Sequence, residues 1–266
     1  MDLLTKVMPP GFIEGVWFLI KEYLPLFLDG IKYTIIISLS GTIIGLLLAI
    51  IITPIKIQTI SKRDKKIMLI LKRVSIFLTT SYVEILRGTP MMVQAAIFYY
   101  GLRGIGVDLS LNFLGIFTIP GIIVSGILIV SINTSAYIIE VLRGSINAID
   151  KGQMEAARSL GMTRRQAMLK IIIPQALKNS IPAIGNEFVI NIKDTSVLSI
   201  IAVTELFYMT KRVNSIYFRQ TEGFVIAAIF YLILTFTTTR ILYWLSNKLS
   251  NTKEKKQVSF PTSQSY

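Results

Sequence analysis

Two long runs of residues without a charged side chain constrain this chain more than any other feature. Residues 33–55 are 23 consecutive uncharged residues, and residues 109–139 are 31. A helix needs about 20 apolar residues to cross the hydrocarbon core of a bilayer, so both runs are long enough to span. Only 16% of the residues are charged, whereas a soluble domain has about 25%. The sequence therefore predicts an all-α integral membrane protein.

We expect about five transmembrane helices. They cover residues 31–55, 74–102, 119–141, 181–203 and 223–245. The second segment is too long for one straight crossing. Gly88 and Pro90 in its middle predict a break, because proline removes a backbone donor and clashes with the preceding turn.

The distribution of Lys and Arg predicts the orientation of these spans. Residues 56–73 and 142–180 hold seven each and the C-terminal tail holds four, a total of 18 on one side against seven on the other. Cytoplasmic loops carry the excess of Lys and Arg, so these three segments face the cytoplasm. The N-terminus is then outside and the C-terminus inside. The net charge of +13 is mostly this orientation signal.

The chain divides into three expected regions. Residues 1–30 form an extracytoplasmic segment, in which Trp17 and Tyr23 suit a helix lying in the membrane interface; a sixth span over residues 11–30 is the alternative, but it would spoil the charge asymmetry. Residues 31–249 form the transmembrane domain. Residues 250–266, polar and rich in Ser and Lys, are expected to be a disordered cytoplasmic tail.

Several classes of function are excluded by residues that the sequence lacks. It has no cysteine and no histidine, which rules out thiol chemistry, histidine general bases and Cys/His zinc sites. It has no phosphate-binding G-x-x-x-x-G-K-[ST] motif and so cannot hydrolyse ATP by that route. The nucleic-acid-binding modules are absent as well. We expect no cofactor, no metal and no nucleic-acid partner.

The cytoplasmic segment 142–180 predicts a short helix, a tight turn and a second helix at the inner face of the membrane. Gly161 follows a run of helix formers and suits a left-handed C-terminal cap. Thr163 suits the N-cap of the second helix, and Pro174 is expected to interrupt that helix. Ala156 and Ala157 make the first helix slim enough to pack closely against another surface, although a solvated loop helix has the same pattern.

The spacing within this segment resembles the EAA loop of membrane subunits of binding-protein-dependent ABC importers. The matching residues are Glu155-Ala156-Ala157, Gly161, Ile171 and Ile173-Pro174. Ile173 stands where leucine is usual, a volume-conserving change. The resemblance implies a type I ABC importer permease fold. It also implies a coupling helix that docks on a separate ATPase through Glu155, Ala156, Ala157, Gly161 and Pro174.

Two further segments are similar to the polar amino-acid permeases, the histidine/glutamine/arginine/cystine group. The first is Glu84-x-x-Arg87-Gly88-Thr89-Pro90-x-x-x-Gln94, and the second is Asn191-x-Lys193-Asp194-Thr195-Ser196. The resemblance covers most of the chain. It implies import of a polar amino acid by a complex of two permease subunits, identical or paralogous, two ATPase subunits and an extracytoplasmic amino-acid-binding protein.

Charged residues inside the spans are candidates for the translocation pathway, because such charges are expensive in a membrane and usually functional. Lys193 and Asp194 are adjacent and do not face each other on a helix, so each needs a partner from another helix, from water or from a substrate. On another helix, Glu84 and Arg87 are the expected candidates. The full candidate set is Glu84, Arg87, Thr89, Gln94, Asn186, Asn191, Lys193 and Asp194. Both signs of charge together with amides suit a zwitterionic amino acid. A structural ion-pair network that pins the spans together fits the same residues.

The motif Glu-x-Leu-Arg-Gly occurs twice, 56 residues apart, at residues 84–88 and 140–144. In both copies Glu and Arg are three residues apart and therefore neighbours on one helix face. Coincidence and common ancestry explain the repeat equally well.

The function that these features support is a permease subunit in the cytoplasmic membrane that spans it several times and is not itself an enzyme. A self-sufficient secondary amino-acid transporter is the alternative. It would work without an ATPase, but the inverted repeats typical of such transporters are absent.

Overall fold

The structure is a computed structural model that describes residues 7–61, 64–113 and 117–257. Helices dominate it, as expected for an all-α membrane protein. In chain order the elements are α1 (Phe12–Lys56), α2 (Lys66–Gly88), α3 (Met91–Gly104), β1 (Leu111–Phe113), β2 (Phe117–Ile119), α4 (Gly121–Asn147), α5 (Lys151–Ser159), α6 (Arg164–Ala167), the π-helical turn η2 (Met168–Ile172), α7 (Ile173–Asp194), the 3₁₀ helix η3 (Thr195–Ile201), α8 (Leu206–Tyr217) and α9 (Gln220–Gln257). β1 and β2 form an antiparallel hairpin with Leu111 opposite Ile119.

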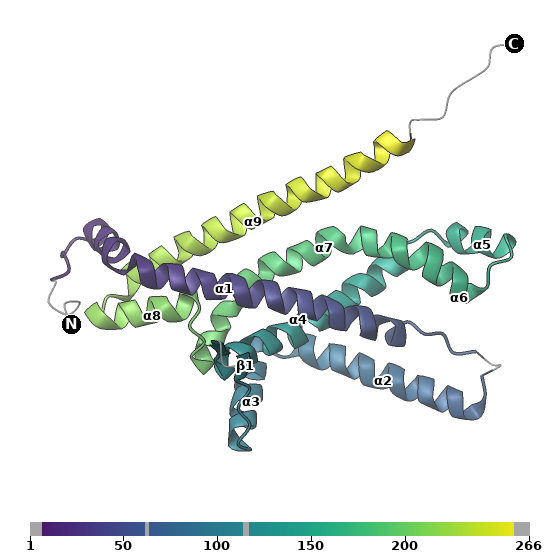
Figure 1. Ribbon diagram of the computed structural model, residues 1–266, viewed down its shortest axis with the longest axis horizontal. Coiled ribbons are helices and arrows are strands. Elements are labelled where there is room, and N and C mark those ends of the chain that lie inside the picture. Colours follow the sequence, from purple (N-terminus) through teal and green to yellow (C-terminus); the bar gives the residue numbers. More distant parts are fainter. Residues whose placement is uncertain (1–6, 62–63, 114–116, 258–266) are drawn as a thin grey trace, which may run out of the picture.

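The segments predicted to face the cytoplasm gather at one end of the molecule. Figure 1 shows the α1–α2 connection and the α5–α6 hairpin together at this end, with the C-terminal part of α9 pointing the same way. The start of α1 and α8 lie at the opposite end (Figure 1). This arrangement agrees with the charge distribution along the sequence, although the N-out, C-in orientation itself stays a prediction.

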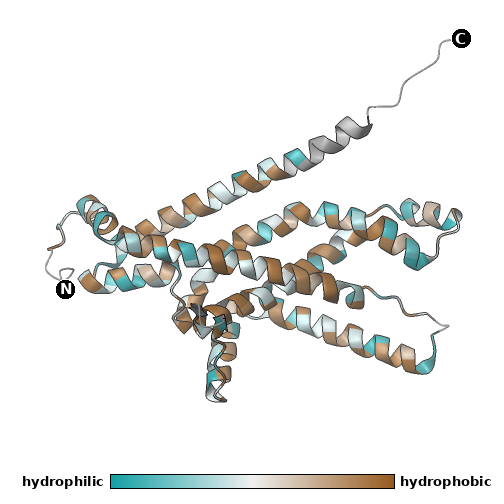
Figure 2. Ribbon diagram, viewed as in Figure 1, coloured by the Kyte–Doolittle hydropathy of each residue, from teal (hydrophilic) through white to brown (hydrophobic). Residues whose placement is uncertain are grey.

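Three helices of the described residues are long and apolar enough to cross a membrane: α1, α4 and residues 220–245 of α9. Figure 2 shows these helices as mostly hydrophobic, while hydrophilic residues are prominent on the α5–α6 hairpin. The predicted break in the second span is confirmed, because α2 ends at Gly88 and α3 begins at Met91 in a different direction (Figure 1). The count of five spans stays a prediction.

The N-terminal segment is not a separate interfacial helix. It is continuous with the first predicted span, so that α1 has 45 residues and is about 67 Å long at 1.5 Å per residue. This length is more than twice the roughly 30 Å of the hydrocarbon core. Part of α1 must therefore extend beyond the core.

The predicted boundaries of the fourth span are also wrong, whereas the fifth span, predicted over residues 223–245, lies within the apolar part of α9 at residues 220–245. α7 ends at Asp194, and the chain then tightens into η3 and turns at Ala202, which has a left-handed backbone (φ 63°). The helix that follows, α8, packs through Leu206 and Val213 against α1 and α9. α9 continues to Gln257, so helix replaces the first part of the expected disordered tail; residues 258–266 lie outside the described part.

Among the described residues, the most extensive contact between two helices is that of α1 with α4. The face of α1 that turns inward carries small, buried residues three or four positions apart. They are Thr34, Ser38, Gly41, Gly45, Ala49 and Thr53. A Cβ on Gly45 would lie 2.9 Å from the carbonyl oxygen of Ser131 in α4. Small residues at this spacing let two helices in a membrane approach until their backbones touch.

We predict that Gly45→Val destabilises the protein, because the added side chain would push α1 away from α4. Overpacking of this kind costs about 1–3 kcal/mol, which should appear as a lower midpoint of thermal unfolding in lipid nanodiscs. Gly144→Val is the matched control, since a Cβ at Gly144 meets nothing within 4 Å. An equal effect of both substitutions would contradict this account of the α1–α4 contact.

Candidate functional site

The first helix of the cytoplasmic hairpin, α5, is closed at both ends by its own sequence. At its start the carboxylate of Asp150 accepts a hydrogen bond of 2.6 Å from the backbone N–H of Gly152. At its end Gly161 has φ +82°. The N–H groups of Met162 and Gly161 donate to the carbonyls of Ala157 (3.1 Å) and Arg158 (3.0 Å), which is the Schellman pattern. The predicted left-handed cap is confirmed.

The second helix of the hairpin begins at Thr163 with a complete capping box. The N–H of Gln166 donates to the Thr163 hydroxyl at 3.2 Å, and the Gln166 side chain accepts from the N–H of Thr163 at 2.8 Å. The backbone N–H groups of Thr163 and Gln166, which have no partner within the helix, are satisfied in this way. The hairpin therefore has a fixed turn between two capped helix ends, and residues 160–163 do not need a partner to be ordered.

The expected interruption at Pro174 is wrong. Helical structure continues from Arg164 through Pro174 to Asp194 as α6, η2 and α7. Pro174 cannot donate to the carbonyl four residues earlier, and the helix adapts by widening to a π turn just before it, in which the N–H of Ile173 reaches the carbonyl of Met168. Such widened turns absorb a local misfit without ending the helix.

The five predicted coupling residues do not share one environment. Ala157 is buried, with 5% of its surface exposed, and so is Ala167 in the second helix of the hairpin. Glu155, Ala156, Gly161 and Pro174 are exposed. Sequence reasoning missed Leu160, whose side chain is 83% exposed at the tip of the hairpin. An apolar residue directly before the capping glycine was the available signal.

Gln94, one of the predicted pathway residues, closes the break between α2 and α3. Its side-chain amide donates to the carbonyls of Leu86 (2.9 Å) and Thr89 (3.0 Å) and to the Thr89 hydroxyl (2.8 Å). Its carbonyl oxygen accepts from Asn133 of α4 at 2.9 Å. Thr89 and Gln94 thus satisfy the backbone groups that Pro90 frees, and Asn133, which sequence reasoning missed, ties the break to α4.

Asn191 is buried where α1, α4 and α7 meet. Its amide nitrogen donates to the hydroxyls of Thr42 (2.8 Å) and Thr134 (2.9 Å). These three residues come from three different helices and satisfy one another away from water. Buried polar groups that are fully hydrogen-bonded fix the relative position of the helices that carry them.

The two Glu-x-Leu-Arg-Gly motifs face one pocket of about 330 Å³ between α1, α2 and α4. Glu84, Arg87, Glu140 and Arg143 all line it, together with Lys56 of α1. In the second motif Glu140 accepts from Arg143 (2.7 Å) and forms an ion pair with Lys56. In the first motif Arg87 lies over the ring of Tyr137, 5.3 Å from its centroid.

The ion pairs expected between the predicted pathway residues do not form. Over the described residues, neither Lys193 nor Asp194 has a salt bridge to Glu84 or Arg87. Glu84, Arg87, Thr89, Asn186, Lys193 and Asp194 are exposed on the single chain. The structure therefore brings Glu84 and Arg87 together in one pocket but does not join them to the end of α7.

The sequence and the fold have close relatives among known proteins. Residues 67–251 match the family described as binding-protein-dependent transport system inner membrane component. The probable glutamine ABC transporter permease protein GlnM of Bacillus subtilis (strain 168) is 32% identical over 84% of this chain and 93% of its own length. The arginine transport system permease protein ArtQ of the same organism is 31% identical, over 86% of this chain and 94% of its own.

A solved structure agrees with these relatives. The crystal structure of an amino acid ABC transporter with histidines is 33% identical in sequence and has a TM-score of 0.74. The match covers 91% of this chain and 100% of that one.

We predict that Asn191→Ala and Asn186→Ala differ in their effect on stability, although both asparagines lie in α7. Loss of Asn191 removes the hydrogen bonds that it makes with the buried Thr134 hydroxyl and the one that Thr42 accepts, which costs about 0.6–2 kcal/mol in a membrane protein. Asn186 is exposed, so its replacement should leave the thermal unfolding midpoint nearly unchanged. The two midpoints, measured in the same lipid nanodiscs, check this; equal midpoints would show that the Asn191 cluster does not hold the helices.

Proposed function

Since this chain belongs to the family of binding-protein-dependent transport system inner membrane components, we propose that it carries a polar amino acid into the cell as the permease subunit of an ABC importer. It is a multi-pass membrane protein. The observation that carries the proposal is the capped α5–α6 hairpin, which fits the EAA pattern and lies at the end of the molecule where the basic segments gather (Figure 1).

The hairpin is the part of the chain that we propose to contact the ATPase subunits, two in each complex. A rigid turn that presents Ala156 and Leu160 to solvent offers a slim apolar projection, which suits insertion into a groove of another protein. Glu155 and Gly161 lie next to these two residues in sequence. Ala157 is buried in the hairpin, and Pro174 is exposed at the start of α7. The sequence has no phosphate-binding loop of its own, so the energy of ATP has to enter through such a contact.

A second permease subunit, identical or paralogous, explains the side chains that one chain leaves uncovered. Among the residues of α2 only Val83 is buried. Lys193 and Asp194 are exposed at the end of α7, where contact with lipid would be costly. We propose that these charges, with Glu84, Arg87 and Asn186, face an aqueous path between two permease subunits. An extracytoplasmic amino-acid-binding protein would deliver the substrate to it.

Reconstitution separates this proposal from a self-sufficient secondary transporter. The permease is placed in liposomes alone, or with its ATPase and its external binding protein, and uptake of radiolabelled L-glutamine and L-arginine is followed. We expect uptake only in the complete system and only with ATP. Uptake by the permease alone, driven by an ion gradient, would instead establish the secondary transporter.

We predict that Leu160→Asp uncouples the complex without unfolding the permease. The side chain is 83% exposed, so a charge costs little in the free chain, but at the centre of an interface the loss of an apolar anchor weakens binding by about tenfold or more. Co-purification of the ATPase and ATP-driven uptake should both fall.

Leu169→Asp is the matched control, because Leu169 is also exposed, at 53%, but lies in η2 behind the hairpin tip. If Leu160→Asp leaves ATPase binding intact, or if both substitutions abolish it equally, the tip is not the contact.

A further inference from the structure

A pocket of about 450 Å³ lies between the end of α3, the loop before β1 and the start of α4. We call it the outer pocket, because the predicted orientation puts this connection outside the cell. It is lined by Tyr99, Arg103, Asp108, Ser110, Gly121 and Ser125, with Leu102, Val107 and Ile122 as apolar neighbours. Its volume lies within the usual range for small-molecule sites, about 300–1,000 Å³.

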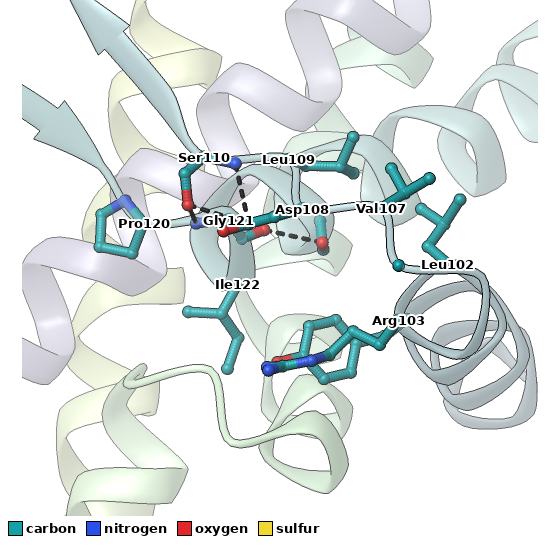
Figure 3. Close-up of a pocket in the computed structure, with 12 residues that line it drawn as sticks. Leu102, Arg103, Val107, Asp108, Leu109, Ser110, Pro120, Gly121 and Ile122 are labelled. Atoms are coloured by element: carbon teal, nitrogen blue, oxygen red, sulfur yellow. Dashed lines mark hydrogen bonds between the residues drawn. The ribbon is translucent and has the colours of Figure 1, made fainter.

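The outer pocket presents opposite charges on facing sides. In Figure 3 the side chain of Arg103 crosses one side of it, and the carboxylate of Asp108 lies on the other. Over the described residues the two form no salt bridge with each other. The cavity between them therefore separates a guanidinium from a carboxylate, which is the arrangement that a zwitterion would bridge.

Each of the two charged side chains is held in place by hydrogen bonds to a neighbouring residue. Arg103 donates from Nη1 to the Tyr99 hydroxyl at 2.9 Å and lies over the same ring. Asp108 uses Oδ1 to accept from the backbone N–H (3.1 Å) and the hydroxyl (2.9 Å) of Ser110. In the part of the chain that the structure describes, these bonds leave Nε and Nη2 of Arg103 and Oδ2 of Asp108 available to a ligand.

Gly121 fixes the distance between the Asp108 wall and α4. Its N–H donates to the Ser110 hydroxyl at 3.0 Å, and a Cβ at this position would collide with Oδ1 of Asp108 and lie 3.0 Å from the N–H of Ser110. The loop can pack on the first turn of α4 only because this residue is glycine. The loop that carries Asp108 is thus preorganised, which lowers the entropic cost of binding a ligand.

We propose that the outer pocket binds the head group of a free amino acid on the extracytoplasmic side, with the α-carboxylate on Arg103 and the α-ammonium on Asp108. The apolar neighbours Leu102, Val107 and Ile122 would contact the first carbons of the side chain. The choice of ligand class rests on the proposed function. The pocket is separate from the pathway residues Glu84, Lys193 and Asp194, none of which lines it.

A concave site favours a small molecule over a surface of the external binding protein. A protein–protein contact of this kind needs about 800 Å² on each partner and is mostly flat. Here Arg103 and Asp108 instead line one cavity. An amino acid also matches the pair by chemistry, because it carries one charge of each sign on a single carbon.

The absence of cysteine from the chain allows a direct test by thiol labelling. Val107→Cys places a thiol on the pocket wall, and Val7→Cys, at the N-terminal end, is the matched control outside it. The complex of permease and ATPase is held in lipid nanodiscs without ATP, and the rate of reaction with a methanethiosulfonate reagent is measured with and without L-glutamine or L-arginine.

We expect saturating amino acid, at ten times its Kd, to slow labelling of Val107→Cys about tenfold and to leave Val7→Cys unaffected. Glutaramate lacks the ammonium, and L-glutamine amide lacks the carboxylate. Each leaves one charged side chain of the pocket unmatched, so each should need a concentration about tenfold higher than L-glutamine to give the same protection. Arg103→Gln and Asp108→Asn, each combined with Val107→Cys, should weaken protection by a similar factor.

Three outcomes would overturn the site: no protection by either amino acid, protection that survives both charge substitutions, or protection by the external binding protein but not by free amino acid. ATP-driven uptake by the unsubstituted complex keeps the two proposals apart. Uptake without protection removes the outer pocket alone, whereas protection without any ATP-driven uptake removes the proposed function and leaves the pocket.

Discussion

The hydrocarbon core of a membrane offers no water to the backbone, so an interruption of a helix within that core has to be closed by another part of the chain. The break at Thr89 is closed by Gln94, which Asn133 of α4 holds in place. The turn into α8 is closed by Glu205, whose carboxylate accepts from the N–H groups of Phe207 (2.9 Å) and Tyr208 (2.7 Å) and from the hydroxyl of Tyr231 in α9 (2.7 Å). The helix breaks are therefore also the points where separate helices are joined.

The apolar surroundings in the membrane also determine how α1, α4 and α7 stay together. Lipid is as apolar as leucine, so apolar side chains alone give little preference for helix over lipid, and close backbone contact has to supply it. Gly45 lets α1 reach the backbone of α4 at Ser131, and the Asn191 cluster adds α7 by hydrogen bonds that no lipid can replace. Close backbone contact and specific hydrogen bonds therefore favour one relative position of these three helices.

Local signals predicted local structure well. Gly161 and Thr163 specify their caps through bonds to residues within a few positions, so the hairpin could be derived from the sequence. Pro90 likewise predicted its break. Pro174 did not interrupt the helix, because the chain widens to a π turn before it, in which the N–H of Ile173 reaches the carbonyl of Met168.

Contacts between distant segments could not be derived in the same way. Nothing near Asn191 in sequence shows that Thr42 and Thr134 will receive its amide, and the two Glu-x-Leu-Arg-Gly motifs carry no sign that they will line one pocket. The continuity through Pro174 has a mechanical consequence for the proposed coupling. Residues 164–194 form one helical rod of 31 residues, about 46 Å long, which begins beside the exposed tip at Leu160 and ends at Lys193 and Asp194. A helix interrupted at Pro174 would absorb a displacement of the hairpin at the membrane surface, whereas a continuous one carries it to Asn191, where α1 and α4 are attached. In the coupling that we propose, a movement of the ATPase against the hairpin would therefore reach the Asn191 cluster and, through its hydrogen bonds, α1 and α4.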